Sequence, residues 1–423
     1  MGRTVFHGTC VKLLYLSQYF PPEIGATQTR AYEMATNLVA FGHQVTILTE
    51  VPNHPSGIIP PQYRSRFRVV EKMDGVLVVR NWVYASPIKT FRTRMLFYLS
   101  FMVTAVINSF FLKGGYDAVY VTSPPLFVGI AGLAIARIRG IPFILEVRDL
   151  WPESAVELGQ LGNPRYIRWG HALANLCYRS ARAVVSVTQG IHDVLLSKGL
   201  SPDKVFLIKN GTNPERYHYI YDGALEEKLG WKGKFVVLYA GIHGVAQGLE
   251  KIIDAAALLS AGAHIQFAFI GEGPRKRELR EYVAKRGLLG IQFLPEVPSD
   301  EVARYLSLAS VCVVPLKKNE LFKGALPSKM FDAWACGKPL LLTVDGEARK
   351  ELESARGGVF VEPENVEAIA GAIDMLFRNP SMGKEMGENG RRYVYEKGYI
   401  RSVQAKALCR IIENIVRPDV QHG

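Results

Sequence analysis

Short apolar runs rich in β-branched residues alternate along the chain with stretches in which apolar residues recur every three or four positions. The runs are typical of buried strands and the stretches of helices that pack on a sheet, so the pattern predicts strand–helix–strand units and parallel sheets. The predicted strands of the first half span 12–16, 44–49, 76–83, 118–122, 142–147, 183–187 and 205–209, and those of the second half span 235–239, 265–270, 291–294, 311–316, 339–343 and 359–361.

The helices predicted between these strands are amphipathic. Ala31, Met34 and Leu38 lie on one face of a helix predicted over 27–41, and a helix predicted over 247–260 has the same spacing. Helices of this kind cover the faces of a parallel sheet. The fold class that the pattern predicts is therefore α/β.

A chain of 423 residues exceeds the size at which one hydrophobic core usually stops growing. The strand–helix alternation lapses in a polar, tyrosine-rich segment over 214–230 and resumes at Lys234. We therefore expect two Rossmann-like domains, one over 1–215 and one over 231–399.

The composition is globular, with 48% hydrophobic and 21% charged residues. The five cysteines are scattered and have neither the spacing of a zinc site nor that of a redox dithiol. The first residues also lack the pattern of a signal peptide. These features predict a reduced, cytoplasmic setting.

The formal net charge of +12 predicts an acidic partner, for which nucleic acid, anionic lipid and a phosphorylated substrate are the candidates. A basic run over 64–94 is followed at once by an uncharged apolar segment from Met95 to Leu112. This order favours a membrane surface that is contacted by the region 64–112, and we expect no nucleic acid. As a helix, the apolar segment would be about 27 Å long, so it could be a buried helix, lie in the membrane interface or span the bilayer.

In open parallel sheets, ligands bind beyond the carboxyl ends of the strands, where glycine loops and helix N-termini face anionic groups. The first predicted strand leads to Gly25, which is either a close approach to a phosphate or a simple turn. The strand over 235–239 leads to a glycine-spaced loop, which is either a phosphate cradle or a tight turn. The candidate donor-binding residues of this loop are Gly241, His243, Gly244 and Gln247, although His243 could equally be a capping or surface residue.

Further segments are expected at the same rim. In the most distinctive one, over 323–339, Ser328 would cap a helix whose free amides and Lys329 face an anion. Asp332 follows one helical turn later, where it either binds ribose hydroxyls or is an ordinary charged position. The candidate donor-binding residues of these segments are Gly271, Glu272, Pro295, Glu296, Val297, Gly324, Leu326, Pro327, Ser328 and Asp332.

Other kinds of chemistry lack their motifs. No histidine pair has the helical spacing of a zinc site, and no Gly-x-Ser-x-Gly motif is present, which argues against a hydrolase. A nicotinamide-dependent oxidoreductase would need Gly-x-Gly-x-x-Gly after its first strand, where this chain has Pro-Pro-Glu-Ile-Gly.

The order of the segments resembles the retaining glycosyltransferases of family 4 over nearly the whole chain. Within that family, Asp149-Leu150-Trp151-Pro152-Glu153 and Leu326-Pro327-Ser328-Lys329 resemble a branch of bacterial O-antigen and capsule transferases that includes amino-deoxyhexose transferases. The motifs that carry the resemblance are Gln18 to Gly25, Asp149 to Ser154, Lys209-Asn210-Gly211, Gly241 to Gly248, Gly271-Glu272-Gly273, Gly324 to Pro339 and Gly357 to Pro363.

The resemblance implies the GT-B fold, in which two facing Rossmann-like domains are separated by a cleft. The N-terminal domain would bind the acceptor, the C-terminal domain would bind the nucleotide-sugar donor, and the last helix, within 400–423, would pack back on the first domain. Gly25 and the segment Gly324 to Ser328 would surround the diphosphate and the sugar, Leu294 to Val297 would border the base, and Asp332 would contact the ribose.

The chain departs from the family pattern around the diphosphate. The first of two family glutamates falls on Gly324, for which Glu320 is a substitute, and the arginine and lysine of the phosphate loop fall on Ile242 and Gln247. Neutralisation of the diphosphate is thus left to a cation elsewhere, for which the candidates are Lys329, Lys323 and Arg275.

On the acceptor side, Arg148-Asp149 replaces a histidine that is frequent in the family. The expected catalytic residues are therefore Lys329, which stabilises the departing diphosphate, and Asp149 or Glu153, which orients or deprotonates the acceptor hydroxyl.

These expectations describe a retaining, metal-independent hexosyltransferase that needs no cofactor. It would transfer a UDP-linked sugar, such as an N-acetylated amino sugar or a deoxyhexose, to a lipid-linked saccharide in lipopolysaccharide or capsule synthesis, as a peripheral protein on the inner face of the cytoplasmic membrane. The alternatives are a UDP-sugar 2-epimerase of the same fold, against which the segment 149–154 argues, and a catalytically inactive basic scaffold that binds membrane or nucleic acid.

Overall fold

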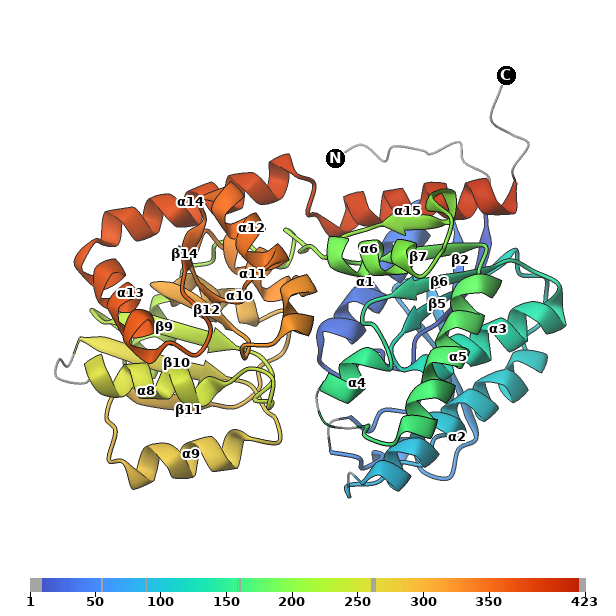
Figure 1. Cartoon of the computed structure of the whole chain (residues 1–423), viewed down its shortest axis with the longest axis horizontal. Coiled ribbons are helices and arrows are strands. Elements are labelled where there is room, and N and C mark those ends of the chain that lie inside the picture. The colour runs from blue at the N-terminus through green and yellow to red at the C-terminus, as the bar shows by residue number, and fades with distance from the viewer. Residues whose placement is uncertain are drawn as a thin grey trace. The chain divides into compact units, whose positions relative to one another are not determined.

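The chain forms two compact units, each a sheet covered by helices on both faces (Figure 1). The computed structural model describes residues 10–417 except 55, 89, 158, 160 and 260–263. Unit 1 consists of Met1–Lys209 and Arg401–Gly423, and unit 2 consists of Asn210–Ile400.

The sheet of unit 1 has eight strands in the order β3-β4-β2-β1-β5-β6-β7-β8. Neighbouring strands are parallel except for β3 and β4, which are antiparallel. The strands are β1 (Lys12–Leu16), β2 (Gln44–Glu50), β3 (Arg68–Met73), β4 (Val76–Asn81), β5 (Ala118–Ser123), β6 (Phe143–Val147), β7 (Ala183–Ser186) and β8 (Val205–Leu207).

The edge strand β3 was not predicted, and it adds one antiparallel pair to a first sheet that is otherwise parallel. Its sequence, Arg-Val-Val-Glu-Lys-Met, mixes charged and apolar residues because an edge strand is only partly buried. The turn to β4 is formed by Asp74 and Gly75, whose φ angles of 46° and 82° are typical of a two-residue hairpin. The Asp-Gly pair was the signal in the sequence that could have revealed the hairpin.

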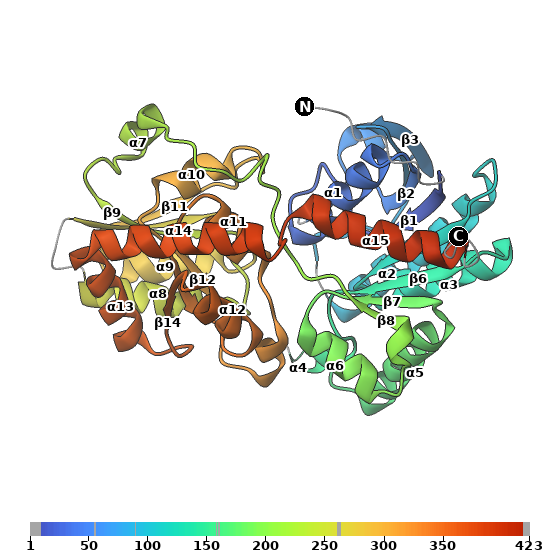
Figure 2. The ribbon, with the colours of Figure 1, turned by 90° about the horizontal axis from the view of Figure 1, so that it is seen from above.

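Helices cover both faces of the first sheet. One face packs against α1 (Ala26–Ala40) and α15 (Arg401–Val416), which lie side by side (Figure 2). The buried Arg401 Nε donates to Glu33 Oε2 over 2.9 Å and so joins these two helices. The other face packs against α2 (Phe91–Phe110), α3 (Leu126–Arg139), α5 (Pro164–Ser180) and α6 (Gln189–Ser197).

The sheet of unit 2 has six parallel strands in the order β11-β10-β9-β12-β13-β14. The strands are β9 (Phe235–Ala240), β10 (Ile265–Ile270), β11 (Ile291–Leu294), β12 (Val311–Pro315), β13 (Leu340–Thr343) and β14 (Gly358–Phe360). One face packs against α8 (Leu249–Leu259), α9 (Lys276–Lys285) and α13 (Val366–Arg378), and the other against α10 (Val302–Leu308), α11 (Ser328–Ala335), α12 (Glu347–Ala355) and α14 (Pro380–Glu396). The strand order reverses between β9 and β12, which places ligand-binding loops beyond their carboxyl ends.

The short elements lie in the connections. They are the helices α4 (Glu153–Glu157) and α7 (Gly223–Leu229) and the single turns η1 (Pro61–Tyr63), η2 (Pro202–Lys204) and η3 (Glu320–Gly324).

A buried ion pair lies inside unit 1. Arg30 of α1 donates from Nε and Nη2 to Glu146 Oε1 over 2.9 and 2.7 Å, and Thr122 also donates to Glu146. Burial acts to raise the pKa of Glu146, but the charges of Arg30 and Arg148 and these hydrogen bonds outweigh it and lower the pKa to about 2. The pair fixes α1 to the sheet below the loop that contains Gly25.

We expect Glu146→Gln to lower the free energy of unfolding by about 3–5 kcal/mol, because the charge of Arg30 would remain buried without a counter-ion. The exposed pair of Arg378 and Asp374 provides the control, since Asp374→Asn should change stability by less than about 1 kcal/mol. Urea unfolding of both variants measures the difference. The folded pKa of Glu146 lies below the unfolded value of about 4.3, so this contribution is complete above that pH and is lost as the pH falls to about 2.

Candidate functional site

Lys329 provides a half-buried positive charge at the carboxyl-end rim of the second sheet. It lies in the first turn of α11, and its Nζ is 3.0 Å from Tyr239 Oη and 4.3 Å from the centre of the Tyr239 ring. Among the described residues, no carboxylate forms an ion pair with it. Burial lowers the pKa of Lys329 to about 8, although the charge of Asp332 acts in the opposite direction. A partly buried ammonium group that forms no ion pair is suited to bind an anionic ligand.

The glycine loop between β9 and α8 lies directly against this ammonium group. Gly241 has a φ of 145°, and a Cβ atom at this position would overlap Nζ and Cε of Lys329. Gly271, at the end of β10, has a φ of 131°, and a Cβ atom at this position would overlap the carbonyl oxygen of Gly241. The two loops are joined by a hydrogen bond from the Gly241 N–H to the Ile270 carbonyl, at 2.8 Å. Glycine at these positions therefore keeps the backbone close to the charge of Lys329.

His243 is fully buried below the same loop, so the reading of it as a surface residue was wrong. Its ring lies 5.8 Å from the Tyr239 ring, 6.5 Å from Phe269 and 6.0 Å from Phe293, measured between ring centres. Burial and, to a smaller extent, the nearby charges of Lys276 and Lys329 lower its pKa to about 4. The histidine is therefore neutral and supports the loop from the protein interior.

The remaining residues of the predicted phosphate loop are partly exposed. Gly244 and Gln247 are half-buried, and a Cβ atom on Gly244 would overlap Oε1 of Gln247. Lys317 N donates to the Ala246 carbonyl over 2.8 Å, which brings the end of β12 to this loop.

The loops after β10 and β11 are connected by Lys276. Its Nζ donates to the carbonyls of Gly271 and Leu294, both at 2.8 Å, and forms an ion pair with Glu272 at 2.6 Å. Glu296 is largely exposed, but the partial burial of its carboxyl group and the charge of Glu272 raise its pKa. Pro295 is exposed as well, whereas Val297 packs in the core, so its side chain does not line an open surface.

The start of α11 differs from the prediction in one respect. Ser328 was expected to cap the helix, but Pro327 occupies the cap position and no side chain caps the helix. Ser328 is the first helical residue, and its neighbour Leu326 is buried while its carbonyl accepts from Asn210 Nδ2 over 3.1 Å. The first N–H groups of α11 are thus not satisfied by a side-chain cap, as expected for a helix that receives an anion.

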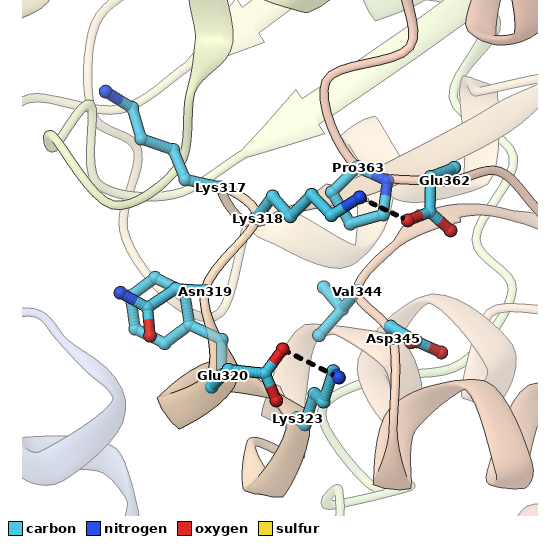
Figure 3. Close-up of a pocket in the computed structure, with 10 residues that line it drawn as sticks. Lys317, Lys318, Asn319, Glu320, Lys323, Val344, Asp345, Glu362 and Pro363 are labelled. Atoms are coloured by element: carbon cyan, nitrogen blue, oxygen red, sulfur yellow. Dashed lines mark ion pairs between the residues drawn. The ribbon is translucent and has the colours of Figure 1, made fainter.

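A pocket of about 190 Å³ lies beyond β12, β13 and β14 (Figure 3). Lys318 pairs with Glu362 across it at 2.9 Å, and Lys323 pairs with Glu320 at 2.8 Å. Glu320, the proposed substitute for the glutamate missing at Gly324, therefore lines the pocket and already has a cationic partner.

The three predicted cations are not equivalent. Arg275 pairs with Glu250 at 3.2 Å and with Glu278 at 2.5 Å, and Lys323 pairs with Glu320. Lys329 is the one of the three that has no carboxylate partner in the described part of the chain, which makes it the strongest candidate for binding a diphosphate.

The candidate acceptor residues belong to unit 1. Asp149 follows β6 and lines a pocket of about 210 Å³ to which four aromatic side chains contribute. Burial raises its pKa to about 6 and the charge of Glu153 adds to this, while hydrogen bonds from Ser154 and from the backbone of Leu150 oppose it. A carboxyl group in this range is suited to accept a proton near neutral pH. The aromatic residues of the pocket are Tyr19, Tyr98, Phe127 and Trp151.

Glu153 is a weaker candidate for proton transfer. Its Oε1 forms an ion pair with Lys198 Nζ at 2.8 Å and lies 3.7 Å from His171 Nδ1. The carboxylate is therefore already neutralised, and as far as the structure describes the chain it does not line the aromatic pocket.

The N-terminus of α1 lies close to Arg148. Gly25 is the cap residue in an extended conformation, and Arg148 Nη2 donates to the Ala26 carbonyl over 3.3 Å. Nε and Nη1 of Arg148 are buried and have no hydrogen-bond partner among the residues that the structure describes. Arg148 was assigned no role from the sequence, and the pocket at Asp149 was not predicted either, because residues distant in the chain assemble it.

One cluster in unit 1 brings together residues that bind metals in other proteins. Ligand atoms of His43, Cys409 and Glu413 lie within 4.8 Å of one another. However, His43 Nδ1 accepts a hydrogen bond from Val11 N at 3.2 Å, so the ring proton is on Nε2, which faces Cys409 Sγ at 2.6 Å. This tautomer has no lone pair for a metal on Nε2, and the cluster instead joins α15 to the start of β1.

Comparisons with known proteins agree with this architecture. Residues 25–211 match the model of the glycosyl transferase 4-like domain, and residues 223–393 match that of the glycosyl transferases group 1. The chain is 26% identical over 410 residues to the putative colanic acid biosynthesis glycosyl transferase WcaI of Escherichia coli, which covers 92% of this chain and 98% of that protein.

Solved structures show the same fold. Sucrose-phosphate synthase from Thermosynechococcus elongatus matches with a TM-score of 0.75 and 18% identity over 97% of this chain and all of that one. Anabaena HepE in complex with UDP-glucose matches with a TM-score of 0.71 and 14% identity over 95% and 99% of the two chains. The two parallel α/β sheets therefore form a GT-B fold, as the sequence predicted.

The fold and the two family matches, which together cover most of the chain, define the class of protein. The chain belongs to the group 1 glycosyltransferases.

Proposed function

We propose that the protein is a retaining glycosyltransferase that takes its sugar from a UDP-sugar. The observation that carries the proposal is the half-buried ammonium group of Lys329, which lies against Gly241 and forms no ion pair with any described carboxylate. A nucleotide diphosphate supplies a counter-ion. The base is chosen because HepE, which has the same fold, was solved with UDP-glucose.

In the proposed reaction, the bond from the anomeric carbon to the diphosphate breaks while the acceptor oxygen bonds to that carbon on the same face. Lys329 and the free N–H groups of α11 stabilise the negative charge that develops on the departing UDP. Asp149 accepts the proton of the acceptor hydroxyl. The protein's own groups supply these steps, and we propose that neither a metal ion nor another cofactor is needed.

We further propose that the acceptor is a lipid-linked saccharide in the synthesis of a bacterial surface polysaccharide such as O-antigen or capsule. The relation to WcaI, whose name refers to colanic acid biosynthesis, supports a polysaccharide pathway. The aromatic walls of the Asp149 pocket support a saccharide acceptor, because sugar rings pack on aromatic faces. A lipid-linked acceptor places the protein at the inner face of the cytoplasmic membrane, and the transferred sugar would be an amino sugar or a deoxyhexose.

A thermal-shift panel of UDP, GDP and ADP tests the donor assignment. Of the three nucleotides, we expect only UDP to raise the melting temperature clearly, since a ligand at 100 times its dissociation constant stabilises the folded state by about 2.7 kcal/mol. Incubation with UDP-sugars and a lipid-linked acceptor should then release UDP only when the acceptor is present. An equal shift with all three nucleotides would contradict the UDP assignment, and conversion of the UDP-sugar to its 2-epimer would contradict the transferase assignment.

A further inference from the structure

Helix α2 exposes an apolar stripe on the side that faces away from the sheet. Leu96, Val103, Ile107 and Phe110 are 50%, 49%, 41% and 64% exposed, and their spacing of seven, four and three residues places them on one helical face. Among the described residues, α2 is also the one helix with the length and apolar composition of a membrane span, a test that buried core helices pass too. Only 28% of its most apolar window is buried, so α2 is not a core helix.

The opposite face of α2 is part of unit 1. Phe101 and Ala105 lie in the core below the sheet, and Thr104 Oγ1 donates to the Trp82 carbonyl over 2.8 Å. Asn108 Nδ2 donates to Asn81 Oδ1 of β4, also over 2.8 Å. A spanning α2 would bring this strand and its polar groups into hydrocarbon, which is strongly unfavourable. The helix can therefore meet a membrane only with its outer face.

Helix α5 extends the exposed surface with aromatic residues. Trp169 is 73% exposed and Tyr166 is 54% exposed. The Tyr166 ring stacks on Phe91 at the start of α2, with 5.8 Å between ring centres. Because α2 and α5 both contact α3 and pack into the same core cluster, their outer faces point away from the same side of the sheet (Figure 1).

The charge of this surface is wholly positive. Neither α2 nor α5 contains an aspartate or a glutamate. Arg92 and Arg94 are exposed in the first turn of α2, and Arg165 and Arg168 are exposed in the first turns of α5. Tryptophan and tyrosine beside arginine are typical of residues that lie at the headgroup level of a bilayer.

We propose that the outer faces of α2 and α5 dock unit 1 on a membrane that contains anionic lipids, with α2 lying in the interface. The uniform positive charge selects this occupant over a second copy of the chain, which would bring two arginine-rich surfaces together. The apolar stripe of α2 and the side chain of Trp169 would insert into the membrane interface, and the arginines would attract the anionic headgroups. This inference rests on the proposed function, because a lipid-linked acceptor requires a transferase at the membrane surface.

Vesicle flotation tests the docking surface. The full chain should float with vesicles of phosphatidylcholine and phosphatidylglycerol and much less with phosphatidylcholine alone, and added salt should weaken the binding. The double variant Phe110→Ser/Trp169→Ser should lower the bound fraction about tenfold or more, because binding scales with the apolar area inserted.

The matched control removes two equally exposed apolar side chains from unit 2. Leu258 and Leu289 are 57% and 82% exposed, so Leu258→Ser/Leu289→Ser should bind vesicles as the unaltered chain does. Failure of the unaltered chain to float, or an equal loss in both double variants, would overturn the proposal. So would a dimer in size-exclusion chromatography that only Phe110→Ser/Trp169→Ser dissociates. The thermal shift with UDP, measured on the same samples, separates the two proposals. If UDP gives no shift, the transferase assignment fails; if UDP gives a shift but the chain does not bind vesicles, only the docking surface fails.

Discussion

Replacement of Lys329 by methionine should weaken UDP binding about 100-fold, because the variant loses a charged hydrogen-bond donor in a site shielded from water. Without ligand, the melting temperature of the variant should stay the same or rise, since burial disfavours the charged ammonium group, as its lowered pKa shows. Loss of affinity without loss of stability distinguishes a binding role from a structural one. Calorimetric titration with UDP and a thermal melt measure the two quantities.

The pKa of Lys329 adds a second test. Because that pKa is lowered to about 8, the ammonium group loses its proton as the pH rises above this value, and the affinity for UDP should fall in the same range. In Lys329→Met this dependence should disappear.

Lys338 provides the matched control for Lys329. It is also half-buried in unit 2, lies 5.2 Å from the centre of the Tyr219 ring, and has a pKa lowered by burial. It precedes β13, whereas Lys329 lies beyond the carboxyl ends of the strands. Lys338→Met should leave the affinity for UDP within about twofold. A similar loss in both variants, or none in Lys329→Met, would contradict the donor site.

The sheets could be predicted from the sequence because strands buried on both faces are continuous apolar runs. The predicted strands over 12–16, 265–270 and 291–294 have the bounds of β1, β10 and β11, and the other predicted strands differ from the observed ones by one or two residues at their ends. Strand β3 was not predicted because its charged residues were interpreted as part of a basic run. An edge strand with one solvated side does not produce the apolar signal.

The sequence predicted which segments form the site but not how their charges are paired. The loop glycines and Lys329 could be placed at one rim because the order of strands, loops and helices puts them there. The state of each charge was not visible, since ion pairs such as Lys198 with Glu153 join residues far apart in the chain. For the same reason, the sequence could not show that Arg275 pairs with two carboxylates while Lys329 pairs with none in the described part of the chain.

The segment Met95 to Leu112 shows the same limit in another form. Its composition fits a buried, an interfacial and a spanning helix equally well. The structure decides against a span, because Asn108 and Thr104 bind the β4 region through hydrogen bonds on one face. It also decides against a fully buried helix, because the opposite face is apolar and exposed.

On the acceptor side, Asp149→Asn should lower kcat about 1,000-fold while leaving the thermal shift with UDP unchanged, because the amide cannot accept the proton of the acceptor hydroxyl. The pKa of Asp149 is raised to about 6, mainly by burial. In the unaltered protein, kcat should therefore fall about tenfold for each pH unit below that value, as the carboxylate becomes protonated. Asp149→Asn should lack this acidic limb.

Glu153→Gln separates the two carboxylates that the sequence left open. This substitution removes the ion pair with Lys198, so it should change the free energy of unfolding only slightly. The acidic limb of the dependence of kcat on pH should remain. If Glu153 were the base, the outcomes would exchange, with the acidic limb absent in Glu153→Gln and present in Asp149→Asn. A limb that persists in both variants would mean that neither carboxylate accepts the proton, and the departing diphosphate would then be the remaining acceptor in a transfer on the same face of the sugar.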